Sequence, residues 1–332
     1  MKIAMIGSFA HAGAMLNGLA GVPDARVVAA SPYGPEDRLA FIGKHPMTPA
    51  DLPVYQDYRG MLEDVRPDLA GVYVPMHRIA EVCMAAAERG CHVVAEKPLA
   101  TELADLEKLR QAVRRSGVQV IAALGMRGEP CFQAIRKAVQ DGLVGRCVLA
   151  FGQKSYPFAA REAVYANRQT YGGSIPWQAI HALDVVGYCA GRDYARVAAM
   201  HANVAHPTHP GMEDAGGILL EFAGGGQAII SFDYLRPWDK AVKRPWGDER
   251  LRLVGTEGVL ELVEQGQQVE LLTPAAQQRL PLPPGRNFVG EFIEHLRDGR
   301  PCLLTMEESF RMTEVALKAR LAADTGKIVA LT

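Results

Sequence analysis

Short apolar segments alternate with amphipathic segments over the first 124 residues of the chain. The apolar segments are rich in Val, Ile and Ala, which is typical of parallel strands buried on both faces. The predicted strands are residues 3–6, 27–30, 69–74, 91–95 and 118–124, and the predicted helices are residues 13–19, 58–65, 79–89 and 103–115. This alternation predicts an α/β fold with a doubly wound parallel sheet.

The pattern changes at Gly125. A helix at 129–141 and a long alternating strand at 146–153 precede an irregular aromatic stretch at 156–171. Strands then dominate: 197–202, 217–222, 227–234, 250–254, 259–263 and 269–272. They predict an open, mostly antiparallel sheet of about six strands. Helices at 287–297 and 306–324 and a strand at 328–331 close the chain.

We therefore expect two domains, residues 1–124 and residues 125–332, and the second should have an α+β fold. The last helix and strand, about 304–332, can pack back on the first domain. A chain of 332 residues is long enough to give each domain its own core.

Composition narrows the class of protein. The formal net charge is -1 and no basic stripe is present, which argues against nucleic acid as the main partner. The six cysteines form no C-x-x-C pair and predict thiols in a reducing compartment. No apolar run approaches transmembrane length, and Met1 leads directly into a strand without the features of a signal peptide. We expect a cytoplasmic protein with no membrane partner.

The turn after the first predicted strand has the layout of a dinucleotide-binding turn. Gly7 takes the first glycine position, Ala12 is accepted at the third, and the following helix would direct its amino terminus at a pyrophosphate. Phe9 occupies the second glycine position. Ser8 and His11 complete the candidate loop. The fingerprint alone does not decide between a nucleotide-binding turn and a strand–helix turn that binds nothing.

The end of the second strand bears on the choice of nucleotide. An NAD site usually has an acid there, but this chain has Ser31-Pro32, and the next acids are Glu36 and Asp37. Arg38 would suit a 2′-phosphate, which gives a slight preference for NADP over NAD. Arg38 as an exposed helix residue is the alternative.

A charged turn, Glu96-Lys97-Pro98, follows the apolar run from His92 to Ala95. Ligands bind at the carboxyl ends of strands in open α/β sheets. A lysine held there can donate to a substrate oxygen, and burial would lower its pKa. The alternative is a surface Glu-Lys pair before a capped helix.

A second candidate is the segment Gly172–Asp184. Trp177 and His181 are four residues apart and His181 and Asp184 are three apart, so we expect all three on one helix face, an unusual combination that indicates a site. The alternative is a packed helix with one satisfied histidine.

Two further groups of residues carry less weight. The first contains His201, His206, His209, Glu213 and Asp214, and it has no helical H-x-x-x-H pair, so we expect no metal site. The second is the polar loop with Lys240, Lys243 and Arg244, flanked by Trp238 and Trp246. It is either a substrate lid or an exposed connection.

Four segments together resemble a known family, glucose–fructose oxidoreductase / inositol dehydrogenase (Gfo/Idh/MocA). They are V-V-A-E-K-P-L-A (93–100), residues 125–146, G-G-S-I-P-W-Q-A-I-H-A-L-D (172–184) and V-G-T-E-G-V-L-E-L (254–262). The resemblance covers nearly the full length. The E-K-P turn after a strand and the G-G…H-x-x-D helix downstream are specific when they occur jointly.

The resemblance implies an amino-terminal Rossmann domain and a carboxy-terminal α+β domain whose open sheet supports a homodimer or homotetramer. It also implies that Lys97 and His181, the predicted catalytic residues, flank the substrate carbon opposite the nicotinamide. The predicted cofactor contacts are Gly7, Ser8, Phe9, His11, Ala12, Ser31, Arg38, Val74, Pro75, His77, Glu96, Lys97 and Arg127. The predicted substrate contacts are Lys97, Tyr156, Arg168, Trp177, His181 and Asp184.

Three positions depart from the family pattern. Trp177 replaces an Asp four residues before the histidine, Val74-Pro75 replaces Thr-Pro, and Phe9 replaces a glycine. The expected function is an NAD(P)-dependent oxidoreductase that interconverts a secondary alcohol and a ketone on a sugar, inositol or related polyol. A ligand-sensing regulatory protein on the same fold is the alternative that Phe9 and Trp177 suggest. Reduction or elimination on a non-sugar substrate is a third.

Overall fold

The computed structural model describes residues 1–239 and 246–331, which divide into two compact units. The first unit contains Met1–Gly125 and Asn287–Thr313, and the second contains Met126–Arg286 and Glu314–Thr332. The sequence assigned residues 287–313 to the second domain, whereas the contacts group them with the first unit. Because compactness does not by itself define a functional domain, the predicted domain bounds stay a prediction.

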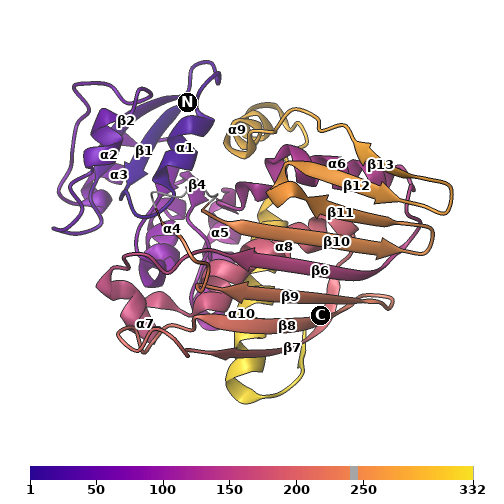
Figure 1. Ribbon diagram of the computed structural model, residues 1–332. Helices are drawn as coiled ribbons and strands as arrows, with labels where there is room; N and C mark the ends of the chain where they lie inside the picture. The colour runs from indigo at the N-terminus through magenta and orange to yellow at the C-terminus, as the bar shows by residue number, and fades with distance from the viewer. Residues whose placement is uncertain (240–245, 332) are drawn as a thin grey trace. The chain divides into compact units, whose positions relative to one another are not determined.

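The first unit contains a five-stranded parallel sheet of order β2-β1-β3-β4-β5 (Figure 1). The strands are β1 (Lys2–Ile6), β2 (Arg26–Ser31), β3 (Leu69–Val72), β4 (His92–Ala95) and β5 (Val120–Ala122). The helices are α1 (Ala12–Gly18), α2 (Ala40–Lys44), α3 (Tyr58–Val65), η1 (Met76–Arg78), α4 (Ile79–Ala87), α5 (Leu103–Ser116) and α9 (Phe288–Asp298). The predicted parallel α/β sheet is confirmed.

The strand order changes direction between β1 and β3, because the chain leaves β1 toward β2 and returns on the other side of β1. Such a switch point leaves a crevice at the carboxyl ends of the strands, where ligands bind in open α/β sheets. The turn after β1 and the segment after β3 therefore lie together. The backbone N–H of Phe9 donates to the carbonyl of Tyr73 at 2.9 Å.

The second unit contains a nine-stranded sheet of order β13-β12-β11-β10-β6-β9-β8-β7-β14 (Figure 1). Its strands are β6 (Cys147–Ser155), β7 (Tyr194–Ala202), β8 (Ala215–Phe222), β9 (Gln227–Asp233), β10 (Asp248–Gly255), β11 (Val259–Val263), β12 (Gln268–Leu272), β13 (Gln277–Leu280) and β14 (Val329–Ala330). Neighbouring strands are antiparallel except β6 and β9, which are parallel. The mostly antiparallel sheet is confirmed.

The expected number of about six strands in this sheet is too low. β6 and β14, which were predicted as strands, join its middle and its edge. β13 was not predicted because its residues Gln-Gln-Arg-Leu are largely exposed and lack alternation of apolar side chains. Backbone pairing with β12 is what makes it a strand.

Helix α8 (Ile180–Ala190) covers one face of this sheet. Gly152 on β6 allows the close approach, because a Cβ atom there would lie 2.6 Å from Cγ2 of Val186. Ile230 on β9 is buried on that face, whereas its neighbour Ile229 is exposed on the other. The remaining helices of the second unit are η2 (Gly125–Gly128), α6 (Pro130–Gln140), η3 (Ala163–Ala166), α7 (Arg168–Tyr171), η4 (Ile175–Ala179) and η5 (Glu264–Gly266). Helix α10 (Met306–Thr325) begins in the first unit and ends in the second.

Two further expectations concern a membrane-spanning helix and the loop between Trp238 and Trp246. In the described residues, no helix is both long and apolar enough to cross a membrane. The predicted lid loop with Lys240, Lys243 and Arg244 lies outside the described residues. The rings of Trp238 and Trp246 beside it pack edge to face, 5.1 Å apart.

Candidate functional site

The turn after β1 requires a glycine at position 7. Gly7 has a φ of +77°, its N–H donates to the carbonyl of the buried Ser31 at 2.8 Å, and a Cβ atom would lie 2.2 Å from the carbonyl oxygen of Tyr73. Only glycine adopts this backbone angle without strain, and no side chain fits against Tyr73. The first position of the predicted fingerprint is thus explained by the packing of β1 against β3.

Phe9, at the second glycine position, turns its ring into the protein. Its side chain is buried and packs edge to face against Tyr33, with 6.0 Å between ring centroids. The ring therefore fills space between the turn and the segment after β2. Ala12 begins α1 and is fully buried.

Asp37 is a residue of this region that the sequence did not select. Its buried carboxylate accepts hydrogen bonds from the N–H and Oγ of Ser8, and from the N–H groups of Tyr33 and Leu39. Such a carboxylate brings a negative charge to the turn after β1. No local pattern indicated it, since Asp37 lies six residues beyond the end of β2.

Arg38, which the sequence assigned to a 2′-phosphate, is exposed. It lines a cavity of about 350 Å³ together with Leu39, Ile42, Lys44 and Pro49. The carboxylate of Asp37 and the side chain of Arg38 therefore have different surroundings, although they are adjacent in sequence.

Glu96 joins the E-K-P turn to the turn after β1. Its fully buried carboxylate accepts from the N–H of His11 at 3.0 Å and lies 2.9 Å from His11 Nδ1, and its other oxygen accepts from the N–H of Lys97 at 3.0 Å. Burial alone would raise the pKa of Glu96. The charges of His11 and Lys97 and the hydrogen bonds from His11 outweigh burial and lower this pKa. The structure thus brings three predicted site residues together.

Lys97 is buried at the carboxyl end of β4, with 1% of its surface exposed, and the Lys97-Pro98 peptide bond is cis. The turn is fastened to α10, because the N–H of Leu99 donates to Oγ1 of Thr313 at 3.3 Å. A surface Glu-Lys pair, the alternative considered from the sequence, is excluded by this burial. Among the other predicted cofactor contacts, Val74 and Pro75 are buried and His77 is exposed.

In the second unit, His181 follows an irregular helix. Residues Ile175–Ala179 form a π-helical segment, η4, and α8 begins at Ile180. Gln178 holds this segment to the sheet through hydrogen bonds from Nε2 to the carbonyls of Lys154 (3.2 Å) and Asp233 (2.6 Å). Single π-turns of this kind occur frequently at functional sites.

The prediction that Trp177, His181 and Asp184 share one face assumes α-helical spacing. Trp177, however, lies in the π-helical segment. The side chain of Trp177 is buried against Tyr165, 6.0 Å between ring centroids, whereas His181 is partly exposed. Asp184 is buried and pairs with Arg127. The three side chains have different surroundings: Trp177 lies in the π-helical segment, whereas His181 and Asp184 lie in α8.

Asp184 and Arg127 form a buried ion pair. Nε of Arg127 lies 3.0 and 2.9 Å from the two carboxylate oxygens and Nη2 lies 2.7 Å from one of them, and the guanidinium also stacks on Tyr188 at 4.9 Å. This pair fixes η2 to α8. Removing one partner of such a pair leaves a buried charge uncompensated. The predicted ligand contacts of these two residues stay predictions.

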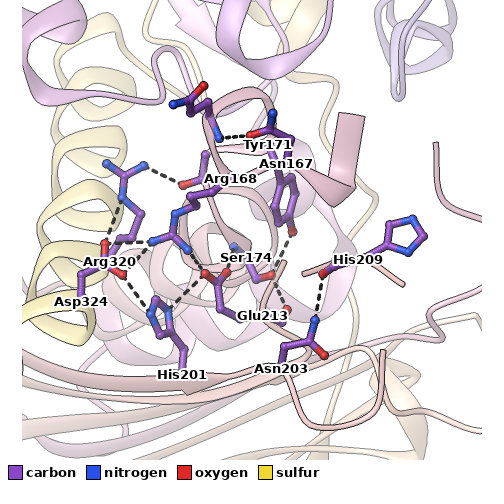
Figure 2. A network of polar contacts seen from close by, with 12 residues as sticks. Asn167, Arg168, Tyr171, Ser174, His201, Asn203, His209, Glu213, Arg320 and Asp324 are labelled. Carbon is purple, nitrogen blue, oxygen red and sulfur yellow. Dashed lines mark hydrogen bonds and ion pairs between the residues drawn. The ribbon is translucent and has the colours of Figure 1, made fainter. Parts of the chain in front are cut away.

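Arg168 lies in a network of charges around the turn Gly172–Ser174 (Figure 2). It pairs with Glu213 and, at 2.8 Å, with Asp324, and Glu213 accepts from the N–H of Ser174 at 2.7 Å. On the same side, Arg320 donates to the carbonyl of Gly172 at 2.7 Å. The network holds the glycine turn that leads into η4, and it occupies the guanidinium of Arg168.

The histidines considered for a metal site make contacts of different kinds. His201 lies 3.0 Å from Asp324 in the network of Figure 2, His206 lies 3.0 Å from Asp214, and the ring of His209 contacts Phe158. Across the described part of the chain, no three metal-binding side chains are grouped closely enough to hold an ion.

Comparisons with known proteins agree with this architecture. Residues 1–124 match the model of an oxidoreductase family with an NAD-binding Rossmann fold, and residues 132–261 match the GFO/IDH/MocA carboxy-terminal domain. A solved Thermotoga maritima structure, provisionally described as an oxidoreductase, is 33% identical. It covers 99% of this chain and 100% of its own, with a TM-score of 0.92.

Curated relatives are more distant. An uncharacterised oxidoreductase of Bacillus subtilis is 28% identical over 62% of this chain, and the myo-inositol 2-dehydrogenase of Thermotoga maritima is 23% identical over 74% of it. The matches span 58% and 69% of the lengths of those two proteins. Since both halves match the family models and the solved relative is similar along its entire length, the chain belongs to the Gfo/Idh/MocA family of NAD-binding oxidoreductases.

Proposed function

We propose that this protein is a nicotinamide-dependent dehydrogenase that interconverts a secondary alcohol and a ketone on a sugar, inositol or related polyol. The observation that carries the proposal is the bridge formed by Glu96, which ties the buried Lys97 to the turn that would hold the nucleotide. The name of the Thermotoga maritima relative, an inositol dehydrogenase, supports the substrate class.

The residues of the first unit fit a dinucleotide. Gly7 lets the turn after β1 pass beside β3, and the buried carboxylates of Asp37 and Glu96 hold the backbone of this turn through the N–H groups of Ser8 and His11. The bound nicotinamide would accept or supply the hydride.

The chain itself would supply orientation and proton transfer. Lys97 would hydrogen-bond the reacting oxygen, since three ammonium donors on a buried side chain suit an oxygen that gains negative charge. His181 would take or give the proton as general base or acid. Buried Arg127–Asp184 would keep α8 in place.

Two observations favour NAD over NADP, opposite to the slight preference taken from the sequence. The buried Asp37 carboxylate lies against the turn after β1, where its negative charge would repel a 2′-phosphate. Arg38, the proposed phosphate ligand, is exposed beside a separate cavity.

Replacing Asp37 tests this preference. Asp37→Asn should reduce the ratio of the Kd for NADPH to the Kd for NADH by about tenfold, because it removes the repelling charge. Fluorescence titration of both reduced nucleotides measures the ratio. Glu36→Gln, an exposed neighbour, is the control and should leave it unchanged. A wild-type protein that binds NADPH more tightly than NADH would contradict the preference.

We also propose that two or four copies associate through the exposed face of the nine-stranded sheet. Phe151 pairs with Ile229, which pairs with Leu219, so three exposed apolar side chains form a row across neighbouring strands. Large exposed apolar patches mark protein interaction surfaces.

The catalytic proposal is tested with Lys97→Met, which removes the ammonium group and keeps a side chain of similar volume. The variant should bind NADH as the wild type does and lose about 10²- to 10⁴-fold in turnover across a panel of sugars and polyols. Lys108→Ala, an exposed lysine on α5, is the control. Saturable nucleotide binding without turnover of any polyol would favour the sensing alternative. No binding of NADH or NADPH would overturn the proposed function.

A further inference from the structure

Arg161 has unusual surroundings for an arginine. It lies in the loop between β6 and η3, partly exposed, and its guanidinium faces three tyrosine rings, with centroids 4.6 Å away for Tyr234, 5.2 Å for Tyr165 and 5.6 Å for Tyr156. One terminal nitrogen donates to the carbonyl of Pro157 at 3.3 Å. The cation is therefore largely desolvated on its aromatic sides.

The described residues of the second unit provide no carboxylate partner for this charge. Among the described residues of the second unit, none lies within ion-pair distance of Arg161, and its Nε is buried without a hydrogen-bond partner there. The undescribed residues 240–245 contain no Asp or Glu. An arginine is charged at all accessible pH values, so a largely desolvated guanidinium without a counter-ion favours an anionic ligand.

Arg168, in the same irregular segment, provides the contrast. It is held by Glu213 and Asp324 (Figure 2), so its charge is neutralised within the protein. The two arginines are seven residues apart, and only one of them has carboxylate partners in the described part of this unit. This difference marks Arg161 as the one suited to a ligand.

Aromatic rings connect Arg161 to Trp177, one of the predicted substrate contacts. Tyr165 contacts both Arg161 and Trp177, and Trp177 precedes His181 by four residues. The hydroxyl of Tyr234 lies 2.8 Å from that of Tyr171, which donates to Ser174 at 3.1 Å beside η4. These contacts hold Arg161 on the side of the unit that carries Trp177.

We propose that the substrate carries a carboxylate, as a uronic or aldonic acid does, and that Arg161 binds this group. The inference rests on the proposed function and narrows its substrate class. Arg161 is a specificity residue: it holds the anionic end of the substrate and takes no part in proton transfer. The planar fork of the guanidinium can bind both carboxylate oxygens, which explains an arginine here rather than a lysine.

The test uses pairs of probes that differ by one carboxylate: D-glucuronate with D-glucose, and D-gluconate with D-glucitol. Binding to the full chain with NADH is measured by calorimetry, so the readout does not depend on turnover. The acid should bind at least about tenfold more tightly than its neutral partner. Arg161→Gln should abolish this preference and leave affinity for the neutral compounds unchanged, and Arg161→Lys should retain part of it.

Thermal unfolding of each variant and NADH titration show whether the fold and the nucleotide site are intact. If NADH binds and neutral polyols bind as well as the acids, the carboxylate proposal is overturned and the proposed function stands. If Arg161→Gln still prefers the acids, Arg161 does not bind the carboxylate. If neither acid binds at about 10 mM, the carboxylate proposal is overturned as well. Failure of NADH to bind would instead refute the proposed function.

Discussion

At the scale of single residues, Glu96 connects two separate segments of the first unit's candidate site. It accepts the N–H groups of His11 and Lys97, which are 85 residues and one residue away in sequence. Because it is fully buried, its charge is tolerated only through these partners. Both the stability of the first unit and the shape of the turn after β1 therefore depend on this one carboxylate.

Glu96→Gln should reduce the free energy of unfolding at neutral pH by about 1.5–3 kcal/mol, the usual value of a hydrogen bond to a charged group. The pKa of Glu96 in the folded state lies below the ordinary 4.5. The unfolded state therefore binds a proton more readily, so the stabilisation is present above pH 4.5 and is lost as the pH falls through the folded pKa. Urea unfolding across this range measures the effect.

The variant should accordingly lose less stability on acidification than the wild type. Glu88→Gln, an exposed carboxyl at the end of α4, is the control for the general effect of removing a negative charge. Equal acid sensitivity of Glu96→Gln and wild type would rule out this explanation.

The cysteines give a second prediction at this scale. Five of the six are buried, and burial raises the pKa of Cys91 and Cys147 to about 11 and that of Cys131 to about 12. Burial also raises the pKa of Cys302, but its thiol is the most exposed of the six, so the native protein at about pH 8 should react with a disulfide reagent first at Cys302. Cys302→Ser should remove the fast phase. Two or more fast thiols would contradict the burial.

At the scale of elements, the turn after β1 is set by one glycine. Gly7 and Gly21 both have a positive φ, +77° and +80°, but only Gly7 has a neighbour within 4 Å of its virtual Cβ. Gly21→Ala should cost about 1 kcal/mol from backbone strain alone. Gly7→Ala should cost more, about 2 kcal/mol or above, and weaken nucleotide binding, because the β1–β3 contact must open.

Denaturant unfolding of the two variants measures the difference, and NADH titration gives the effect on binding. Equal losses in both variants would show that the turn tolerates a methyl group against Tyr73.

Element boundaries were predicted well where local chemistry sets them. Helix α3 spans residues 58–65 as predicted, because Asp57 caps its first turn through the N–H of Gly60, and α5 ends before Gly117 in the left-handed region. The π-helical segment η4 was missed. Its geometry depends on Gln178 reaching carbonyls on two strands, and no local pattern records those contacts.

At the scale of the whole molecule, the open face of the nine-stranded sheet predicts association. Ile229→Glu places a charge in the row with Phe151 and Leu219, so it should shift the protein toward the monomer in light scattering at micromolar concentration. Phe41→Glu, at another exposed apolar side chain on α2, is the control and should not change the mass. A wild-type monomer throughout this range would disprove the association.

The sequence by itself determined the parallel and antiparallel sheets, most helix ends, and the position of Glu96-Lys97 at the end of β4. These features depend on hydrophobic periodicity, capping residues and glycine, whose effects act over one or two turns of chain. The motif also indicated the family, since E-K-P and G-G…H-x-x-D recur at a characteristic separation.

Only the tertiary structure decided which charges meet. Arg127 pairs with Asp184 at a separation of 57 residues and Arg168 pairs with Asp324 at 156, whereas Arg161 contacts tyrosine rings and a carbonyl. Strand order and helix packing set these distances, and neither is encoded in a local period. The same residue type therefore anchors the structure at Arg127 and Arg168, whereas Arg161, which has no carboxylate partner among the described residues of its unit, is the one we propose for a ligand.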